Sequence, residues 1–424
     1  MTSTEFFDAL EARDPLQREA AQMAALSRQV AHAQAHSRAL AETLAGVDAS
    51  AVTSRAALAQ LPVLRKSELQ ARQQAARART PRDGLDAFGG FSTLAWGAGV
   101  RPARRVFQSP GGIYEPEGDG PDYWRMARAL HAAGVRAGEL LHNSFSYHLT
   151  PAAAMLEGSA QALGCAVFAG GVGNTELQLQ AVQDLRPSAY AGTPSFLKIL
   201  VDKAEEGGLR LSFAKALVSG EAFPAALRDW LDQRGVAGYQ CYATADVGLI
   251  AYETRAREGL VVDEGVIVEI VRPGSGDPVP DGEVGEVLVT VLQPDYPLIR
   301  LATGDLSAVL PGRCPTGRSN TRLRGWLGRA DQSAKVRGMF VHAGQVAEIV
   351  RRFPEIGRAR LLVEGEMAQD RMSLLIEVAD APEGLIPRVV DAIRDVTKLR
   401  GDVVCVAPGS LPNDGLVIED RRSV

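Results

Sequence analysis

Between residues 120 and 215, short apolar runs alternate with longer runs in which apolar residues recur at helical spacing. The short runs, typical of buried strands, are GELLHNSF, CAVFAG and SAYAGTP. The longer runs, typical of amphipathic helices, are DYWRMARALHAAGV, PAAAMLEGSAQALG, TELQLQAVQDLRP and SFLKILVDKAEEG. Strands that alternate with helices form βαβ units, so this pattern predicts a parallel sheet.

The rest of the chain follows other patterns. Residues 15–45 are rich in alanine with apolar residues at helical spacing, which predicts helix. Between residues 258 and 312, apolar and polar residues alternate between Gly, Pro and Asp turns, which indicates antiparallel strands. After residues 328–332 the pattern indicates strand, helix, strand, strand, helix and strand, as in a small α+β domain.

These patterns together predict an α/β protein in two parts. The first, residues 1–330, is a large domain with mainly parallel sheets and an antiparallel β subdomain at roughly 255–330. The second, residues 331–424, is a small α+β C-terminal domain. A chain of 424 residues is too long for one compact core, which agrees with this division.

Composition excludes several classes of partner. The chain is 46% hydrophobic and 23% charged, as in ordinary globular proteins, and its net charge of −5 argues against binding nucleic acid or an anionic membrane. Its beginning lacks the basic and apolar regions of a signal peptide, and no run of 18 apolar residues is long enough to span a membrane. We therefore expect a cytoplasmic protein.

Several stretches carry candidate chemistry, and their order along the chain is informative. VFQSPGGIYEPEG at 106–118 contains a serine and two glycines, as in loops that hold phosphate. The others are GGVGNTELQLQAVQDLRPSAYAGTPSFL at 170–197, SGEAF at 219–223, YATADVG at 242–248, PLIRLATGDL at 297–306 and GRADQSAKVRGMFV at 328–341. In this order they resemble the phenylacetate–CoA ligase branch of the adenylate-forming enzymes, over nearly the whole chain.

The resemblance implies an activity and its cofactors. Enzymes of this family join a carboxylic acid to ATP as an acyl-adenylate and pass the acyl group to a thiol. The resemblance therefore implies an AMP-forming ligase that uses ATP, Mg²⁺ and CoA, with a carboxylic acid, aromatic by the family's habit, as substrate. A carrier-protein thiol is the alternative acceptor, the C-terminal domain would move about a hinge, and a homodimer is left open.

The resemblance also assigns roles to residues. Asp305 in TGD is similar to the aspartate that accepts hydrogen bonds from the ribose hydroxyls. The positions similar to those that lie against the adenine are Gly220, Glu221, Ala222 and Tyr242. The positions similar to the hinge, its partner arginine and the turn beyond it are Asp331, Arg329 and Arg337. Each also has a structural interpretation on its own, such as a turn, a helix cap or a packed ring.

Three departures from the family concern phosphate. The loop keeps Ser109 and Gly111 of the family's Ser-Ser-Gly-Thr-Thr-Gly-Lys-Pro pattern, but Glu115 stands in place of the lysine. Such a carboxylate would repel a triphosphate by about 1 to 4 kcal/mol at 4 Å. Asp246 stands where the family has a glutamate and would hold Mg²⁺ with a shorter side chain. Leu416 stands where the family has the lysine of the adenylation step.

Because of these departures the use of ATP stays open. Arg104 or Arg105, just before the loop, are candidates to supply the missing positive charge. A zinc site of some relatives is not expected here, because Cys314 alone remains of its ligands, with Thr316 and Thr254 at other ligand positions.

The acid pocket is also assigned by resemblance. Its candidate residues are Phe145, Tyr147, Gly170 and Gly171, which packing at the edge of the sheet would explain equally well. A Ser/His hydrolase built from His142 or His148 with Ser144 or Ser146 is disfavoured, because the chain has no GxSxG motif. Three hypotheses follow: an acid–thiol ligase, a non-adenylating descendant that binds nucleotide or acyl-CoA, and an acyltransferase that uses an acyl group activated elsewhere.

Overall fold

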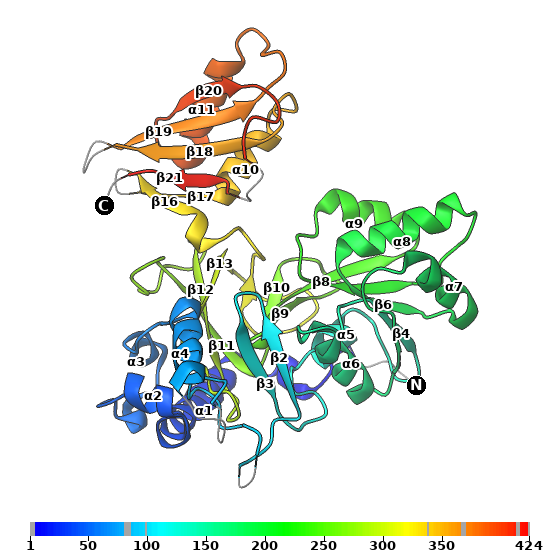
Figure 1. The fold of residues 1–424 in the computed structure, drawn as a ribbon, viewed down its shortest axis with the longest axis vertical. Helices are drawn as coiled ribbons and strands as arrows, with labels where there is room; N and C mark the ends of the chain where they lie inside the picture. Colours follow the sequence, from blue (N-terminus) through cyan, green and yellow to red (C-terminus); the bar gives the residue numbers. More distant parts are fainter. Residues whose placement is uncertain are drawn as a thin grey trace. The chain divides into compact units, whose positions relative to one another are not determined.

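The computed structural model describes residues 5–79, 86–97, 100–336, 339–365, 370–412 and 416–422. By their contacts, the residues divide into two compact units (Figure 1). Unit 1 comprises Met1–Thr303 and Ala308–Gly325, and unit 2 comprises Gly304–Ser307 and Trp326–Val424. The break after Gly325 falls shortly before the boundary at residue 330 predicted from the sequence.

The helices of unit 1 are α1 Pro15–His36, α2 Arg38–Thr43, α3 Arg55–Ala59, α4 Lys66–Arg79, α5 Ala127–Ala132, α6 Ala152–Ala162, α7 Thr175–Leu185, α8 Pro194–Glu206 and α9 Ala225–Asp232. The helix predicted over 15–45 is broken at Ser37, whose side chain caps α2. None of the helices within the described residues is both long and apolar enough to cross a membrane.

Within the described residues, the largest sheet has nine strands, in the order β14-β15-β10-β9-β8-β7-β6-β4-β5. Their bounds are β4 Leu140–Asn143, β5 Ala166–Ala169, β6 Ala189–Gly192, β7 Lys215–Val218, β8 Ala237–Thr244, β9 Gly248–Glu253, β10 Leu260–Val262, β14 Val309–Leu310 and β15 Arg322–Leu323. Strands β4 to β8 pair in parallel, which confirms the predicted α/β fold, and β8 to β10 pair antiparallel.

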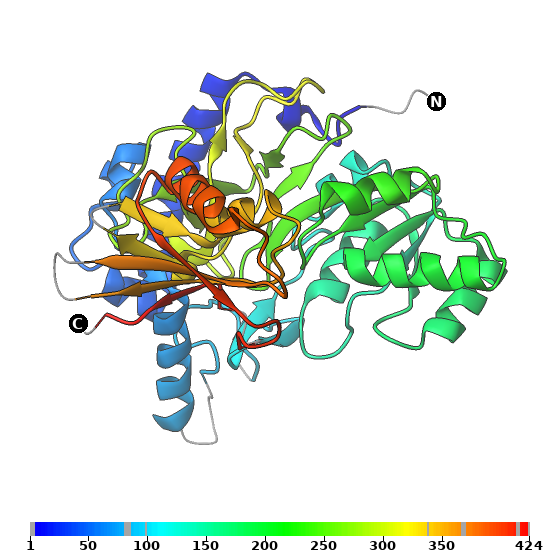
Figure 2. The ribbon, with the colours of Figure 1, turned by 90° about the horizontal axis from the view of Figure 1, so that it is seen from above.

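Helices cover both faces of the parallel strands (Figures 1 and 2). Buried side chains of α5 and α6 pack on one hydrophobic cluster with β4, and those of α7, α8 and α9 pack on another with β6 and β7. The carboxyl ends of neighbouring parallel strands therefore meet at one edge, where ligands bind in open α/β sheets.

A second sheet of unit 1 has the order β1-β13-β12-β11, with bounds β1 Leu64–Arg65, β11 Val266–Val271, β12 Gly285–Val291 and β13 Leu301–Ser307. A separate hairpin is made by β2 Arg105–Ser109 and β3 Ile113–Glu117. The segment predicted as one antiparallel subdomain thus contributes strands to both large sheets. The last residues of β13 belong to unit 2.

Unit 2 has its own hydrophobic core, which includes Val341, Ile349, Leu374 and Ile393. Its elements are β16 Ser333–Val336, β17 Met339–His342, α10 Ala343–Arg351, β18 Ala359–Glu364, β19 Arg371–Glu377, α11 Leu385–Thr397, β20 Asp402–Val406 and β21 Ile418–Asp420. The sheet order is β20-β19-β18-β21, and β16 pairs with β17. The predicted α+β pattern is present, with two more short strands than the sequence indicated.

Candidate functional site

The loop predicted to hold phosphate is the tight turn between β2 and β3 of unit 1. Ser109 pairs with Ile113 across the hairpin, and the N–H of Gly112 donates to the carbonyl oxygen of Ser109 at 3.1 Å. Gly111 and Gly112 have φ angles of 90° and 73°. Residues with a Cβ rarely adopt such angles, so the two glycines make this turn possible.

One side of α4 lies along this hairpin. The residues concerned recur every three or four positions and so share a helix face: Lys66, Gln70, Gln73 and Arg77. The side-chain amide of Gln70 donates to the carbonyl of Gly111. Gln73 donates to the carbonyl of Tyr114 at 2.9 Å and accepts from its N–H at 2.8 Å. The guanidinium of Arg77 lies 4.8 Å from the centre of the Tyr114 ring.

Two buried carboxylates lie behind the turn. Glu115 on β3 is 0% exposed and Asp246, between β8 and β9, is 4% exposed. The hydroxyl of Ser109 donates to Oε1 of Glu115, and Nζ of Lys66 is 2.7 Å from Oδ2 of Asp246. Burial, and then the charge of Asp246, raise the pKa of Glu115 to about 8. Glu115 is thus an interior group that keeps its proton near neutral pH, so the repulsion expected from it is reduced.

The carboxylates also suit a cation. Among the described residues, Oε2 of Glu115 and Oδ1 of Asp246 are buried without a hydrogen-bond partner. Buried acceptors are normally satisfied, and carboxylate oxygens are ligands that Mg²⁺ accepts. The described residues contain no group of three or more His, Cys, Asp or Glu side chains suited to a metal. Asp246 therefore fits the cation role given by resemblance if phosphate and water complete the shell.

Two tyrosines border this cluster. Tyr242 on β8 is half-buried and packs on the core of unit 1, next to a register shift between Tyr242 and Ala243. Tyr296 is buried, its hydroxyl is 3.5 Å from Nε2 of Gln73, and burial followed by the charges of Asp246 and Glu115 raises its pKa. Sequence analysis missed Tyr296, Gln73 and Lys66, although the scarcity of lysine in the chain was a signal for Lys66.

The loop after β7 presents its residues at the carboxyl edge of the parallel strands. Gly220 has a φ of 83°, and Glu221 and Ala222 are exposed. The hydroxyl of Ser195, at the start of α8, donates to Oε1 of Glu221 at 2.9 Å. This contact joins the loops that follow β6 and β7. The role of the loop beside adenine stays a prediction.

The four residues predicted for the acid pocket lie around Asn143 at the end of β4. The N–H groups of Gly170 and Gly171 both donate to its carbonyl oxygen at 3.0 Å. Its side chain donates to the hydroxyl of Tyr147 at 3.1 Å and accepts from the N–H of Phe145 at 3.2 Å. The structure thus brings the predicted residues together through a residue that the sequence did not single out.

Two buried side chains, Gln178 and His142, lie next to the loop that contains Gly170 and Gly171. The amide of Gln178 donates to the carbonyls of Gly171 at 3.0 Å and Gly173 at 2.6 Å, and its Oε1 lies 2.6 Å from Nε2 of His142. Because that oxygen can only accept, His142 carries its proton on Nε2. Ser144 instead donates to the hydroxyl of Tyr190 at 2.6 Å, so the hydrolase interpretation gains no support.

Unit 2 carries the other predicted residues. Oδ1 of Asp305 is 3.2 Å from Nη1 of Arg329 and accepts from the indole N–H of Trp326 at 3.1 Å. Two residues predicted for separate roles are therefore an ion pair. Arg337 and the side chain of Asp331 lie outside the described residues.

Comparison with known proteins gives concordant results. Residues 145–291 match the family of AMP-binding enzymes. The chain is 30% identical to a phenylacetate-coenzyme A ligase of Thermus thermophilus over 291 residues, which cover 65% of each chain. It is 32% identical to the ligase of the same name from Aromatoleum evansii over 221 residues, half of each chain.

A crystal structure of 2-hydroxyisobutyryl-CoA ligase in an open conformation, in complex with 2-HIB-AMP and CoA, superposes with a TM-score of 0.84. The identity is 22%, and the alignment covers 99% of this chain and 95% of that one. The chain thus has the fold of adenylate-forming enzymes, and in sequence it is similar to phenylacetate-coenzyme A ligases. It matches less than two thirds of the length of the curated relatives.

The residues considered for a zinc site, Cys314, Thr316 and Thr254, are hydrogen-bonded to one another. Sγ of Cys314 is 3.1 Å from Oγ1 of Thr316 and 3.4 Å from Oγ1 of Thr254. Arg318 donates to Thr316 at 3.0 Å and to Glu11, near the beginning of the chain, at 2.9 Å. Cys314, the two threonines, Arg318 and Glu11 therefore form one buried hydrogen-bonded cluster.

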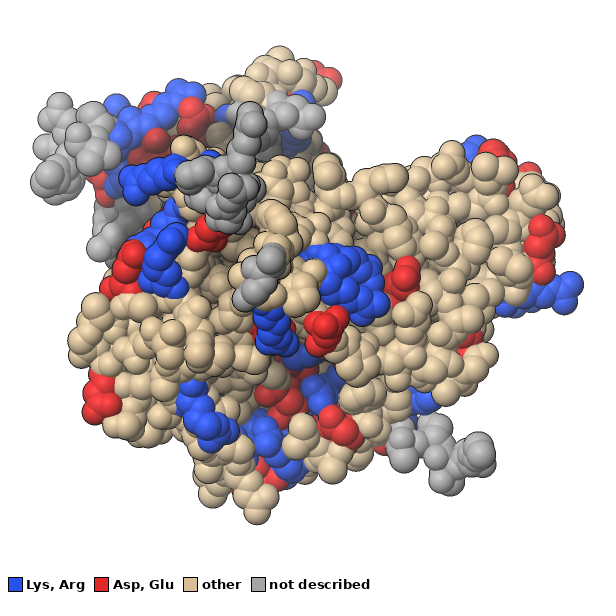
Figure 3. Space-filling model, turned by 60° about the horizontal axis from the view of Figure 1, so that its bottom comes forward, with Lys and Arg blue, Asp and Glu red and all other residues tan. Residues whose placement is uncertain are grey.

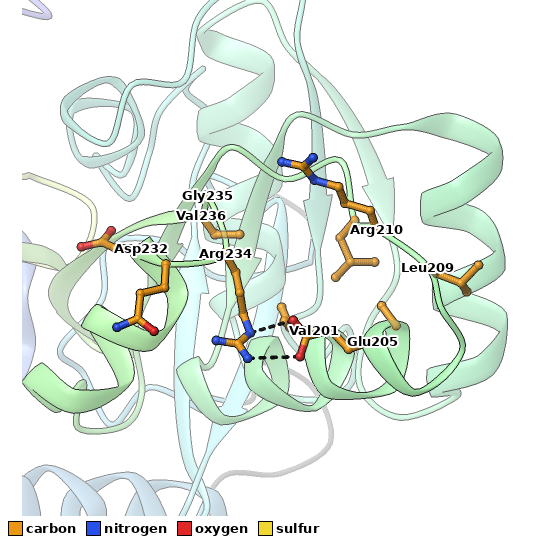
Figure 4. A pocket seen from close by; sticks show the side chains of 11 residues that line it. Val201, Glu205, Leu209, Arg210, Asp232, Arg234, Gly235 and Val236 are labelled. Carbon is orange, nitrogen blue, oxygen red and sulfur yellow. Dashed lines mark hydrogen bonds and ion pairs between the residues drawn. The ribbon is translucent and has the colours of Figure 1, made fainter.

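Two surface features lie apart from the predicted site. A cavity of about 490 Å³ between the ends of α8 and α9 is bordered by the Glu205–Arg234 ion pair and contains no predicted site residue (Figure 4). On the face drawn in Figure 3, basic side chains lie interspersed with acidic ones.

Proposed function

We propose that the chain is an AMP-forming acid–thiol ligase, which activates a carboxylic acid as an acyl-adenylate and transfers the acyl group to CoA or another thiol. The observation that carries the proposal is the cluster in unit 1 where a Gly-rich turn, a lysine and a buried aspartate lie together. These are the groups that a magnesium-bound triphosphate requires. Similarity to phenylacetate-coenzyme A ligases supports the same conclusion.

Each residue of the proposed site has its own role in binding ATP. Backbone N–H groups of the turn at Ser109 and Gly111 cradle phosphate, and Asp246 holds Mg²⁺, which neutralises phosphate charge when bound. Tyr242 and the loop at 220–222 lie against adenine. Asp305 accepts hydrogen bonds from the ribose hydroxyls in addition to its contacts with Arg329 and Trp326. The proposal includes a cytoplasmic location, while a homodimer is a further proposal that no contact described here addresses.

An aromatic acid is the substrate class that we propose. Phe145 and Tyr147 supply aromatic surface, and Gly171 leaves room beside the ring of Tyr147, which a Cβ there would approach to 3.9 Å. A Cβ on Gly170 would lie 2.7 Å from Oε1 of Gln178, so a larger residue would displace the loop.

The test is exchange of labelled pyrophosphate into ATP in the presence of candidate acids, followed by detection of AMP and the acyl-thioester after CoA is added. A ligase exchanges label only with a suitable acid and forms both products. Formation of thioester without ATP consumption would instead identify an acyltransferase. Binding of AMP without exchange for any acid would refute the ligase proposal.

One observation favours a second candidate, a nucleotide-binding descendant that does not adenylate. Leu416 borders an apolar cavity of about 510 Å³ in unit 2 together with Val346 and Val350. The position that resembles the adenylation lysine therefore has an apolar side chain, 44% exposed, at the edge of a cavity that three arginines also line. This candidate predicts that AMP raises the melting temperature but that no pyrophosphate exchanges into ATP. Leu416→Lys would then give measurable pyrophosphate exchange.

A further inference from the structure

The Gly-rich turn brings no cation of its own. Its residues are Ser109, Pro110, Gly111 and Gly112. A triphosphate has several negative charges, and its binding in a partly buried site requires compensating charge. The question is which basic side chain of this chain supplies it.

The arginines suggested by the sequence, Arg104 and Arg105, stand at the far end of the hairpin from the turn, where the N–H of Arg104 donates to the carbonyl oxygen of Glu117 at 2.7 Å. Arg105 pairs with Glu117 in the register of the β2–β3 hairpin, and its Nε is 3.1 Å from Oε2 of that carboxylate. It stands four residues before Ser109, about 13 Å away along the strand. Arg77, on α4, does reach the turn, but its guanidinium is engaged there: it lies over the ring of Tyr114, and its Nη2 donates to the carbonyl oxygen of Gly112 at 3.4 Å.

Lys66 is better placed. It is the first residue of α4, directly after β1, whose Leu64 pairs with Leu301 of β13. One turn further along the same helix face, about 6 Å in rise, Gln70 donates to the carbonyl of Gly111. The base of the Lys66 side chain is thereby fixed beside the turn.

The contacts of the Lys66 ammonium group are compatible with binding an anion. Its Nζ is 2.7 Å from Oδ2 of Asp246, and the side chains are 35% and 1% exposed, respectively. The lysine is thus open to solvent on one side and anchored to a buried carboxylate on the other. An ammonium has three donors, so it can keep Asp246 and still donate to phosphate.

We propose that Lys66 is the phosphate-binding cation of this site and contacts the β- or γ-phosphate of bound ATP. The inference rests on the proposed function and deepens it. The family pattern has a lysine in the turn itself. Here the corresponding role is assigned to Lys66, the first residue of helix α4. Asp246 then serves to hold this lysine as well as to attract a cation.

The test is the affinity of the full-length protein for ATP and for AMP, each measured with Mg²⁺ by calorimetry. Lys66→Gln should weaken ATP binding about tenfold or more, the worth of one charge-assisted hydrogen bond, and should leave AMP binding within about threefold. Lys66→Arg should retain most of the affinity for ATP. Arg65→Gln is the matched control, because Arg65 pairs with Glu286 and is expected to change neither affinity.

Equal ATP affinity of the Lys66→Gln variant and the unaltered protein would overturn the inference while leaving the proposed function intact. If the unaltered protein binds neither nucleotide, the proposed function fails first.

Discussion

Glu115 shows how the role of one residue depends on the strand that carries it. In the sequence it stands in a loop, where its charge would face a phosphate. In the structure it belongs to β3, whose alternation turns Glu115 inward and Tyr114 outward. The carboxyl group therefore lies beside Asp246 in the interior, where ionisation is costly.

The buried position of Glu115 predicts a pH-dependent stability. The pKa of Glu115 is raised from 4.5 to about 8 in the folded state. Between these values the native protein holds a proton that the unfolded chain has lost, so the free energy of unfolding falls as pH rises. We expect a decrease of up to a few kcal/mol between pH 5 and pH 8.5 from this group.

Urea denaturation across that pH range measures the effect. Glu115→Gln keeps the hydrogen bond to Ser109 but cannot ionise, so its stability profile should be flatter and the variant should gain relative stability at high pH. Parallel profiles for the two proteins would show that Glu115 is not the group responsible.

At the scale of elements, periodic segments were predictable and short ones were not. The parallel strands and helices α6 to α8 follow from apolar runs that tertiary packing then buries. The β2–β3 hairpin was missed, because five-residue strands around Pro and two glycines have a weak pattern. Lys66 was missed for a similar reason: its place beside Asp246 depends on pairing between β1 and β13, which are far apart in sequence.

The loop after β5 illustrates what one helix contributes to a site. The first turn of α7 places Gln178 under the glycine loop, where it bonds to two carbonyls and to His142. The resemblance identified the glycines, but only the structure shows what holds them. Gln178 is thus a positioning residue rather than a group that touches the acid.

Gln178→Leu should destabilise the protein by about 1 to 3 kcal/mol, because buried polar groups lose their partners. It should also raise KM for the acid more than it lowers kcat, since the loop loosens without loss of a reacting group. Denaturation and steady-state kinetics measure the two effects. Gln180→Leu, on the exposed side of the same helix, is the control; equal effects of both variants would contradict the proposed clamp.

At the scale of the whole molecule, two hydrophobic cores correspond to the two units. The core of unit 2 is formed by residues after Trp326, and the clusters of unit 1 contain none of them. The sequence predicts a boundary near residue 330, because strand and helix periodicity starts anew after 332. It could not show that the end of β13 belongs to unit 2, since that assignment depends on contacts between distant segments.

Separate cores predict separate unfolding transitions. Ile393 on α11 and Leu200 on α8 are each 0% exposed, and truncation of such side chains to alanine costs about 2 to 5 kcal/mol. Because the two residues belong to different cores, Ile393→Ala should lower one calorimetric transition by about 10 °C or more, and Leu200→Ala should lower the other. ATP with Mg²⁺ should raise the transition that Leu200→Ala lowers, since the Gly-rich turn, Lys66 and Asp246 all belong to unit 1. A single transition lowered alike by both substitutions would mean that the units unfold as one body, and the two-unit division would not describe the energetics of the chain.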